Sequence, residues 1–288
     1  KTPFASFRVF ELLQDSSERE RRTLARRKMY RTIAPWTHEN PLMFHKVQSD
    51  PATIREAIDQ AAEVGFEMVI MSFGSGFNFE SRDKAYWDRY KELADYGRSK
   101  GIALGAYSLL ASRGAANPKD NTQGSPARYG VMPCLGTQWG RDYLDNIVAF
   151  TRYAGFSVFE NDGSYPGDIC CATDHPFHRG KEDSQWVMWR AITQQYQALR
   201  AEGVYLNIPD WYFLTGANKA GMGYRETNWS LPRAEQEIIE RQNIYDGTWS
   251  RTQSMGWMFV PLSQYHGGGA AATIEPLREH LPHYEARF

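Results

Sequence analysis

The sequence is poor in several features that define large classes of protein. It has only three cysteines, two of them adjacent (Cys170 and Cys171), which predicts neither a disulfide framework nor a zinc cluster. None of its apolar runs approaches the ~20 residues that a membrane-spanning helix needs, so we expect no membrane span. No basic and then apolar segment follows the start, KTPFASF, so no targeting signal is visible and we expect a piece of a longer chain.

An excess of charge of one sign is also missing. The 33 basic and 34 acidic residues leave a formal net charge of −1, whereas a nucleic-acid-binding protein usually carries a basic stripe. Only residues 18–31 (ERERRTLARRKMYR) come close to such a stripe. Because this segment mixes Glu with Arg at helical spacing, it is typical of a solvated helix face, and we expect no nucleic-acid partner.

The sequence does contain a repeated unit, in which an amphipathic segment is followed by a short apolar run. Apolar residues at helical spacing predict helices over residues 51–64, 85–100, 139–154, 184–202 and 232–245. Apolar runs predict strands within residues 41–45, 68–71, 102–110, 156–162, 204–210 and 257–264, and residues 222–229 are expected at the mouth of a further strand. These runs are almost continuously apolar, as parallel strands buried on both faces are.

Four of the joins have one form, in which a helix ends at a glycine and an apolar run begins one or two residues later. Gly65, Gly101, Gly155 and Gly203 would supply the left-handed cap that turns the chain back into the sheet. The alternation predicts an α/β fold of the (β/α)8 TIM-type barrel class, with an eighth strand that is short or lies beyond Phe288. A doubly wound open sheet is the alternative, although no Gly-rich phosphate loop follows the first strand.

Polar side chains gather where the predicted strands end. Tyr107, Glu160, Asp162 and Asn207 stand at or just after the ends of three apolar runs. In a (β/α)8 barrel the active site is built at the carboxyl-terminal face, from residues that follow the strands. The sequence therefore predicts an active site at this face.

The order and spacing of seven segments point to a family. They are RTIAPWTHENPLMF, GFEMVIMSFGSGFN, SKGIALGAYSLLASR, GFSVFENDGSYPGD, GVYLNIPDWYF, GMGYRETNWSLPR and GWMFVPLSQYHGGG. From about Arg31 onward this series resembles the catalytic barrel of melibiase-type alpha-galactosidases, which are retaining clan D glycoside hydrolases, and family 36 in particular. Full-length relatives carry a β-sandwich on each side of the barrel. The resemblance thus implies a helical linker or extension over residues 1–30 and a catalytic barrel over 31–288.

The resemblance also implies roles for particular residues. The aspartate nucleophile of the clan follows strand four, where this chain has Asp162, and the acid/base follows strand six, where Glu226 is the only early carboxylate. Gln264 and His266 match the strand-seven loop that lines the sugar pocket. Two departures stand out, because the clan commonly has Lys where this chain has Glu160, and Asp where it has Glu226. The lost positive charge leaves the identity of the sugar open.

The chemistry of glycosidic bond cleavage needs one carboxyl group that attacks or stabilises the anomeric carbon and one that protonates the leaving oxygen. Asp162 suits the first role, since Gly163 permits a tight turn that would present it, although an Asx-turn residue is the alternative. Glu226 suits the second role because its apolar neighbours would raise its pKa, with Asp210 as the rival. Carboxyl groups ~5–5.5 Å apart would mean retention and ~6.5–9.5 Å inversion, which the sequence does not decide.

Further side chains are candidates for binding sugar hydroxyls or stacking on sugar faces, which a 14% aromatic content suits. We expect this set to comprise Trp36, Tyr107, Glu160, Asp168, Asn207, Asp210, Trp211, Tyr224, Trp229, Arg233, Gln264 and His266.

No metal site or cofactor is expected at the active site, and the sequence does not decide whether the chain holds a structural metal. His38, His45 and His266 could be grouped with Asp162, but their spacing matches no metal motif. The run DHPFH (residues 174–178) is only weakly similar to a cation site, and Cys170-Cys171 is expected to be buried and inert.

These features predict an exo-acting alpha-glycosidase that removes a terminal galactose-type sugar from an oligo- or polysaccharide. A catalytically silent carbohydrate-binding barrel and a metal-dependent barrel lyase or isomerase are the alternatives. The substrate class favours a periplasmic or secreted protein, and the sequence fixes neither the oligomeric state nor the linkage that is cleaved.

Overall fold

The computed structural model of the chain describes residues 6, 9–39, 41–124, 127–128, 130–163, 167–208, 212–218 and 257–259. Its α-helices are α1 (Arg19–Ile33), α2 (Pro51–Val64), α3 (Lys84–Ser99), α4 (Gln138–Ala154) and α5 (Ser184–Ala201). Short 3-10 helices are η1 (Pro35–His38), η2 (Pro118–Asp120) and η3 (Phe213–Thr215). The strands are β1 (Leu42–Lys46), β2 (Met68–Met71), β3 (Ala103–Leu109), β4 (Val158–Asp162), β5 (Tyr205–Asn207) and β6 (Trp257–Phe259).

The six described strands form one parallel sheet in the order β5-β4-β3-β2-β1-β6. Its register sets Glu160 of β4 between Tyr107 of β3 and Asn207 of β5. The predicted α/β class with a parallel sheet is therefore confirmed. The closed eight-stranded barrel is not, because the strands of the described residues form an open sheet with β5 and β6 at its edges.

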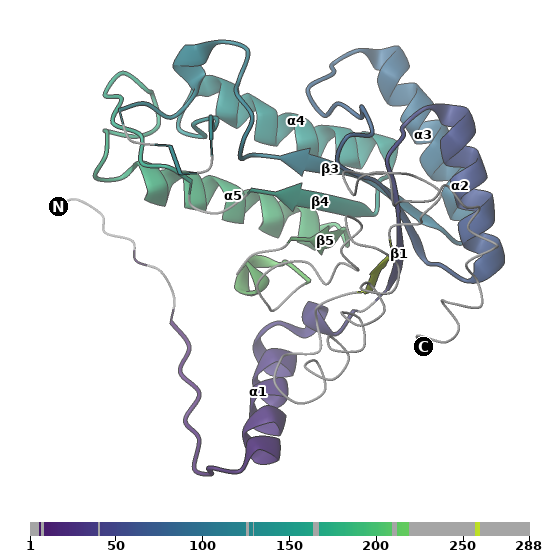
Figure 1. Cartoon of the computed structure of the whole chain (residues 1–288), viewed down its shortest axis with the longest axis horizontal. Helices are drawn as coiled ribbons and strands as arrows, with labels where there is room; N and C mark the ends of the chain where they lie inside the picture. Colours follow the sequence, from purple (N-terminus) through teal and green to yellow (C-terminus); the bar gives the residue numbers. More distant parts are fainter. Residues whose placement is uncertain are drawn as a thin grey trace, which may run out of the picture.

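The helices α2 to α5 cover one face of this sheet. They pack side by side in chain order around its outside (Figure 1). Phe44 and Phe159 point to this face and join the main hydrophobic core, whereas Met43, Ile70 and Val158 form a separate small cluster on the opposite face, here called the inner face. A doubly wound sheet carries helices on both faces, whereas α2 to α5 lie on one face of the described sheet.

The predicted joins between helix and strand are confirmed. Gly65, Gly101, Gly155 and Gly203 have φ angles of 82°, 78°, 70° and 81°, which is the left-handed conformation that ends a helix. Each of the four helices before these glycines begins and ends within one residue of its predicted bounds. The fifth predicted helix (232–245) and the strand mouth at 222–229 lie outside the described residues.

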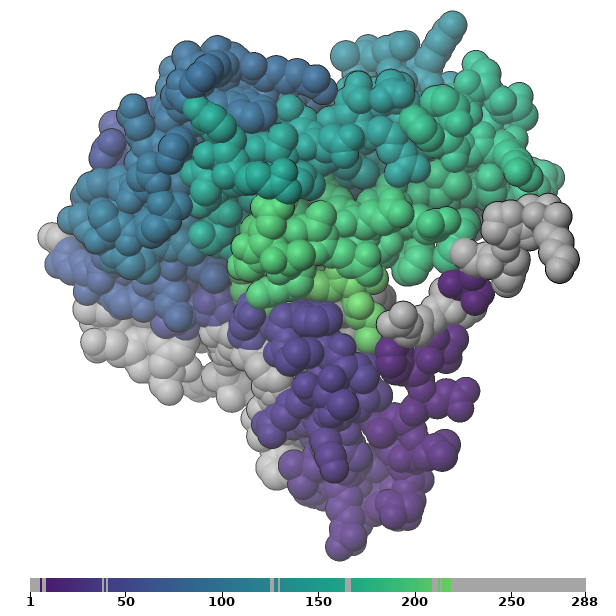
Figure 2. Space-filling model, turned by 180° about the vertical axis from the view of Figure 1, so that it is seen from behind, coloured from purple at the N-terminus to yellow at the C-terminus, as the bar shows by residue number. Residues whose placement is uncertain are grey.

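The helix α1 stands away from the sheet. None of its residues is buried, and it packs mainly against η1. The space-filling view shows it as a purple projection from the blue and green body (Figure 2). The expected solvated helix face over residues 18–31 is thus confirmed, while the division at residue 30 into linker and barrel stays a prediction. Among the described helices, none is long and apolar enough to cross a membrane.

Candidate active site

The strand β4 supplies the charged groups of the candidate site. Its residues alternate between the two faces, so that Phe159 and Asn161 face the helices, where the Asn161 side-chain amide donates to the Tyr196 hydroxyl of α5 at 2.8 Å. Glu160 and Asp162 consequently face the inner side. The predicted carboxylates therefore lie on one face, at successive levels near the carboxyl-terminal edge of the sheet.

Asp162 is the more accessible of the two carboxylates. It is only half-buried, and its Oδ2 accepts a hydrogen bond of 2.6 Å from the Tyr107 hydroxyl of the neighbouring strand. Its Oδ1 accepts one of 2.7 Å from the backbone amide of Gly163. Gly163 has a φ of +66°, and a Cβ there would lie 2.5 Å from the backbone nitrogen of Ala111, so only glycine fits this turn. The turn and the tyrosine together fix the direction of the carboxylate.

Glu160 is buried and serves as a tie across the inner face. Its Oε2 accepts a 3.1 Å hydrogen bond from the side-chain amide of Asn207 in β5, and lies 3.4 Å from Nε2 of His45 in β1. Nδ1 of that histidine lies 3.0 Å from the hydroxyl oxygen of Ser72. Two strands separate β1 from β4 in the sheet, so this contact requires the inner face to be concave.

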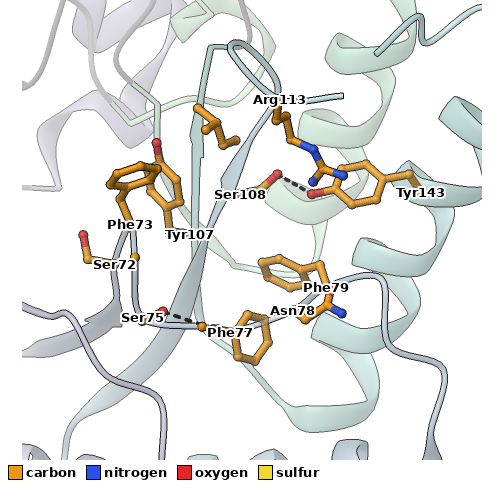
Figure 3. A pocket seen from close by; sticks show the side chains of 13 residues that line it. Ser72, Phe73, Ser75, Phe77, Asn78, Phe79, Tyr107, Ser108, Arg113 and Tyr143 are labelled. Carbon is orange, nitrogen blue, oxygen red and sulfur yellow. Dashed lines mark hydrogen bonds between the residues drawn. The ribbon is translucent and has the colours of Figure 1, made fainter. Parts of the chain in front are cut away.

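A pocket of about 170 Å³ opens beside the Asp162–Tyr107 pair, at the ends of β2 and β3 (Figure 3). Its walls are residues 72–79, the end of β3, and Arg113 and Tyr143, whose hydroxyl pairs with that of Ser108 at 2.8 Å. Tyr107 lines the pocket and also bonds Asp162, and it thereby joins the two.

Aromatic side chains of the loop after β2 divide between core and pocket. Phe79 is 3% exposed, and both it and Phe77 pack edge-on against Phe150 of α4. Phe73 is 46% exposed, and its ring contacts the edge of the Tyr107 ring at a centroid distance of 5.7 Å. Phe73 is not among the binding residues predicted from the sequence, although an aromatic residue directly after a buried strand is a signal for it.

Two predicted binding residues lie apart from this group. Asp168 is buried, and both of its carboxylate oxygens lie 3.1 Å from the backbone amide of Arg128, so it holds a loop and not a hydroxyl at the surface. Trp36 lies in η1, ahead of β1, and its carbonyl accepts from the Asn218 side chain, which also bonds Arg200 in the last turn of α5. The helix η1 directly precedes β1, so Trp36 lies at the amino-terminal end of the sheet, opposite to Asp162.

The remaining predicted site residues lie outside the described part of the chain, and their roles stay predictions. They are Asp210, Trp211, Tyr224, Glu226, Trp229, Arg233, Gln264 and His266.

A second cluster corrects the expectation that the cysteines make no metal-type group. Cys134, Cys170, His175 and His178 are all buried, and their potential ligand atoms lie within 4.8 Å of one another. A hydrogen bond between the two thiols raises the pKa of Cys134 and lowers that of Cys170. The cluster could not be predicted from spacing, because the whole of α4 and β4 separates Cys134 from the other three residues. The neighbouring pair Cys170 and Cys171 is the more conspicuous pattern in the sequence, but Cys171 is not part of the cluster.

Comparison with known proteins shows likeness in fold alone. No protein-family model matches the chain, and no curated protein matches it in sequence. A variant of the family 36 alpha-galactosidase AgaA from Geobacillus stearothermophilus, in complex with 1-deoxygalactonojirimycin, has a TM-score of 0.57 at 13% identity, over 91% of this chain and 41% of that chain. The alpha-N-acetylgalactosaminidase NagBb from Bifidobacterium bifidum, in its GalNAc complex, has a TM-score of 0.49 at 12% identity, over 78% of this chain and 47% of that chain. This chain spans less than half of either structure, and it shares an α/β fold with the first of these glycoside hydrolases.

Proposed function

We propose that the protein is a retaining, exo-acting glycoside hydrolase that cleaves a terminal alpha-linked galactose-type sugar, with Asp162 as nucleophile and Glu226 as acid/base. The observation that carries this proposal is the Asp162 carboxylate, half-buried at the carboxyl-terminal edge of β4 and oriented by the Tyr107 hydroxyl at 2.6 Å. This edge is where barrel enzymes place catalytic groups. The likeness in fold to a family 36 alpha-galactosidase supports the same choice, and we further propose that the sheet closes into a barrel.

The reaction would proceed in two displacements. The Asp162 carboxylate forms a bond to the anomeric carbon as the glycosidic C–O bond breaks, and Glu226 gives its proton to the leaving oxygen. Glu226 then takes a proton from water, whose oxygen attacks the anomeric carbon and releases Asp162. Tyr107 would keep the attacking carboxylate in position through both steps, because its O–H donates to Oδ2.

The surroundings of Asp162 would favour a sugar with an apolar face. Phe73 is exposed beside Tyr107, and aromatic rings of this kind stack on the C–H face of a pyranose. Glu160, which stands where the clan commonly has Lys, is committed to His45 and Asn207. It therefore brings no cation to the sugar hydroxyls, and specificity for the exact sugar would depend on other groups.

The direct test is turnover of an aryl alpha-galactoside by Asp162→Asn, with Asp145→Asn on the exposed surface of α4 as the matched control. We expect kcat to fall ~10³-fold or more in Asp162→Asn. As a check of folding, its melting temperature should stay within about 2 °C of wild type, which corresponds to ~1 kcal/mol or less in a domain of this size. Asp145→Asn should retain wild-type turnover. Near-full activity of Asp162→Asn would reject the assignment.

Two further measurements separate the roles. In Asp162→Ala, azide should attack the anomeric carbon from the opened side and give the beta-glycosyl azide, as expected for a lost nucleophile. In Glu226→Gln, turnover should recover on a substrate with a good leaving group, which needs little protonation. Recovery of Asp162→Asn on that substrate alone would reverse the two assignments.

The buried tie of Glu160 favours a second candidate, a carbohydrate-binding barrel without catalysis. A site that lacks the cation of its relatives could hold a glycan and leave it intact. Affinity for galactosides in a titration, with no reducing sugar released over a broad glycan panel, would favour this candidate over the hydrolase.

A further inference from the structure

A compact group of two thiols and two imidazoles lies outside the candidate active site. Cys134 comes from the segment before α4, whereas Cys170, His175 and His178 come from the segment between β4 and α5. All four side chains are buried, with exposed fractions between 0% and 8%. We propose that they form a structural Zn²⁺ site that clamps these two segments together.

The spacing of the donor atoms fits a tetrahedron around zinc. His175 Nδ1 lies 3.0 Å from His178 Nε2, Cys134 Sγ lies 3.3 Å from the same Nε2, and Cys170 Sγ lies 3.5 Å from His175 Nδ1. With Zn–S near 2.3 Å and Zn–N near 2.0–2.1 Å, tetrahedral angles set neighbouring ligand atoms about 3.3 to 3.8 Å apart. Small movements of the rings would bring all four atoms to this separation.

The tautomer of His175 is set for metal binding. Its Nε2 lies 2.9 Å from the carbonyl oxygen of Lys119, which can only accept, so Nε2 carries the proton. Nδ1, which faces the cluster, is then the unprotonated nitrogen that a metal requires. A backbone carbonyl on the far nitrogen is the usual second contact of a metal-bound histidine.

The surrounding backbone is built to hold the group. The amide of Cys134 donates to the carbonyl of Asp120 at 2.7 Å, and the amide of Cys170 donates to the hydroxyl of Ser184, the first residue of α5, at 3.0 Å. Gly136 leaves room for the His178 ring, because a Cβ there would lie 2.2 Å from its Cδ2. Both segments are therefore anchored before any metal binds.

The chemistry of the donors selects the metal and its role. Two thiolates and two imidazoles form a set that favours zinc over the hard cations Ca²⁺ and Mg²⁺, which prefer oxygen ligands. Four protein ligands in a buried position fill the tetrahedron and leave no place for a reacting water, so the site is structural. Zinc binding would release the thiol protons. It would fasten the segment that follows Asp162 onto the start of α4.

The matched pair of neighbouring thiols provides the test. Cys170 belongs to the cluster, whereas Cys171 points to the carbonyl of Gly124 at 3.4 Å. After the full chain is produced with zinc and dialysed, elemental analysis should give one zinc per wild-type chain and per Cys171→Ser chain. Cys170→Ser should retain less than about a tenth of that amount.

Two measurements on the wild-type chain do not depend on whether the variant folds. Replacement of zinc by Co²⁺ should give the intense visible bands and the near-ultraviolet thiolate-to-cobalt transition of a tetrahedral site with sulfur ligands. A zinc chelator should lower the melting temperature by roughly 10 °C. Neither readout needs catalytic activity, so a failed hydrolase assay leaves this test intact.

Three results would overturn the site. The first is a wild-type chain that binds no metal after reconstitution and whose melting temperature does not change in chelator. The second is an equal zinc content in Cys170→Ser and wild type. The third is a metal-free wild-type chain whose intact mass is two hydrogens lower than expected for free thiols. The last, if Cys171→Ser shows the same loss of two hydrogens, would assign a disulfide between Cys134 and Cys170.

Discussion

The tie between β1 and β4 gives the strongest stability prediction. His45 and Glu160 are almost completely buried, with side-chain exposures of 2% and 3%, and their Nε2 and Oε2 atoms lie 3.4 Å apart. Removing one partner of a buried pair costs about 3–5 kcal/mol, because the other keeps its desolvation penalty. For a domain of this size that corresponds to a fall of roughly 6–20 °C in melting temperature for His45→Ala.

The assay is thermal and urea unfolding of the full chain, compared among His45→Ala, Glu160→Gln and the double variant. Glu160→Gln in the His45→Ala background removes the stranded charge while Asn207 still donates to the remaining side-chain oxygen. We therefore expect the double variant to be more stable than His45→Ala alone. A loss of under ~1 kcal/mol in His45→Ala, or strictly additive losses, would refute the tie across the inner face.

Two further predictions concern residues of β3 that contact β4. Gly105→Ala should lower the free energy of unfolding by about 3 kcal/mol or more, because its Cβ would lie 2.0 Å from the carbonyl oxygen of Val158 in β4. Gly65→Ala is the control, since its φ is +82° but nothing lies within 4 Å of the added Cβ. It should lower the free energy of unfolding by only about 1 kcal/mol. Equal losses in urea unfolding would contradict the close packing of β3 against β4. Tyr107→Phe should lower kcat on the aryl galactoside about 10- to 100-fold, since a hydrogen bond to a charged group is worth ~1.5–3 kcal/mol, and an unchanged kcat would exclude Tyr107 from orienting Asp162.

The fold was predictable where its cause is local. The helix α2 has Asp50 as N-cap, apolar residues at helical spacing and Gly65 at its end. All the signals that set its bounds therefore lie within one continuous stretch of sequence. The parallel sheet was predictable because a short link with a glycine joins each helix from α2 to α5 to the next strand and returns the chain to the sheet. Closure of the sheet is different, since it depends on how strands far apart in the chain meet.

The site was predictable only in part, for the same reason. Asp162 and Tyr107 were identified because each stands at the end of an apolar run. Nothing near Glu160 in the sequence indicates His45, which lies three strands away across the concave face. The residue type of Trp36 suits sugar stacking, yet its position before β1 sets it at the other end of the sheet.

Burial separates the roles of the three carboxylates that the sequence places in and after β4. Glu160 and Asp168 are 2% and 4% exposed. The Oε2 atom of Glu160 contacts His45 and Asn207, and both carboxylate oxygens of Asp168 accept from the Arg128 amide. Carboxylates held in this way offset their own desolvation and shape the loops. Asp162 alone of the three keeps partial contact with solvent, and its two hydrogen bonds orient it without enclosing it. A ligand that approaches this edge of the sheet would therefore meet Asp162, while the other two carboxylates hold the strand and the following segment in place.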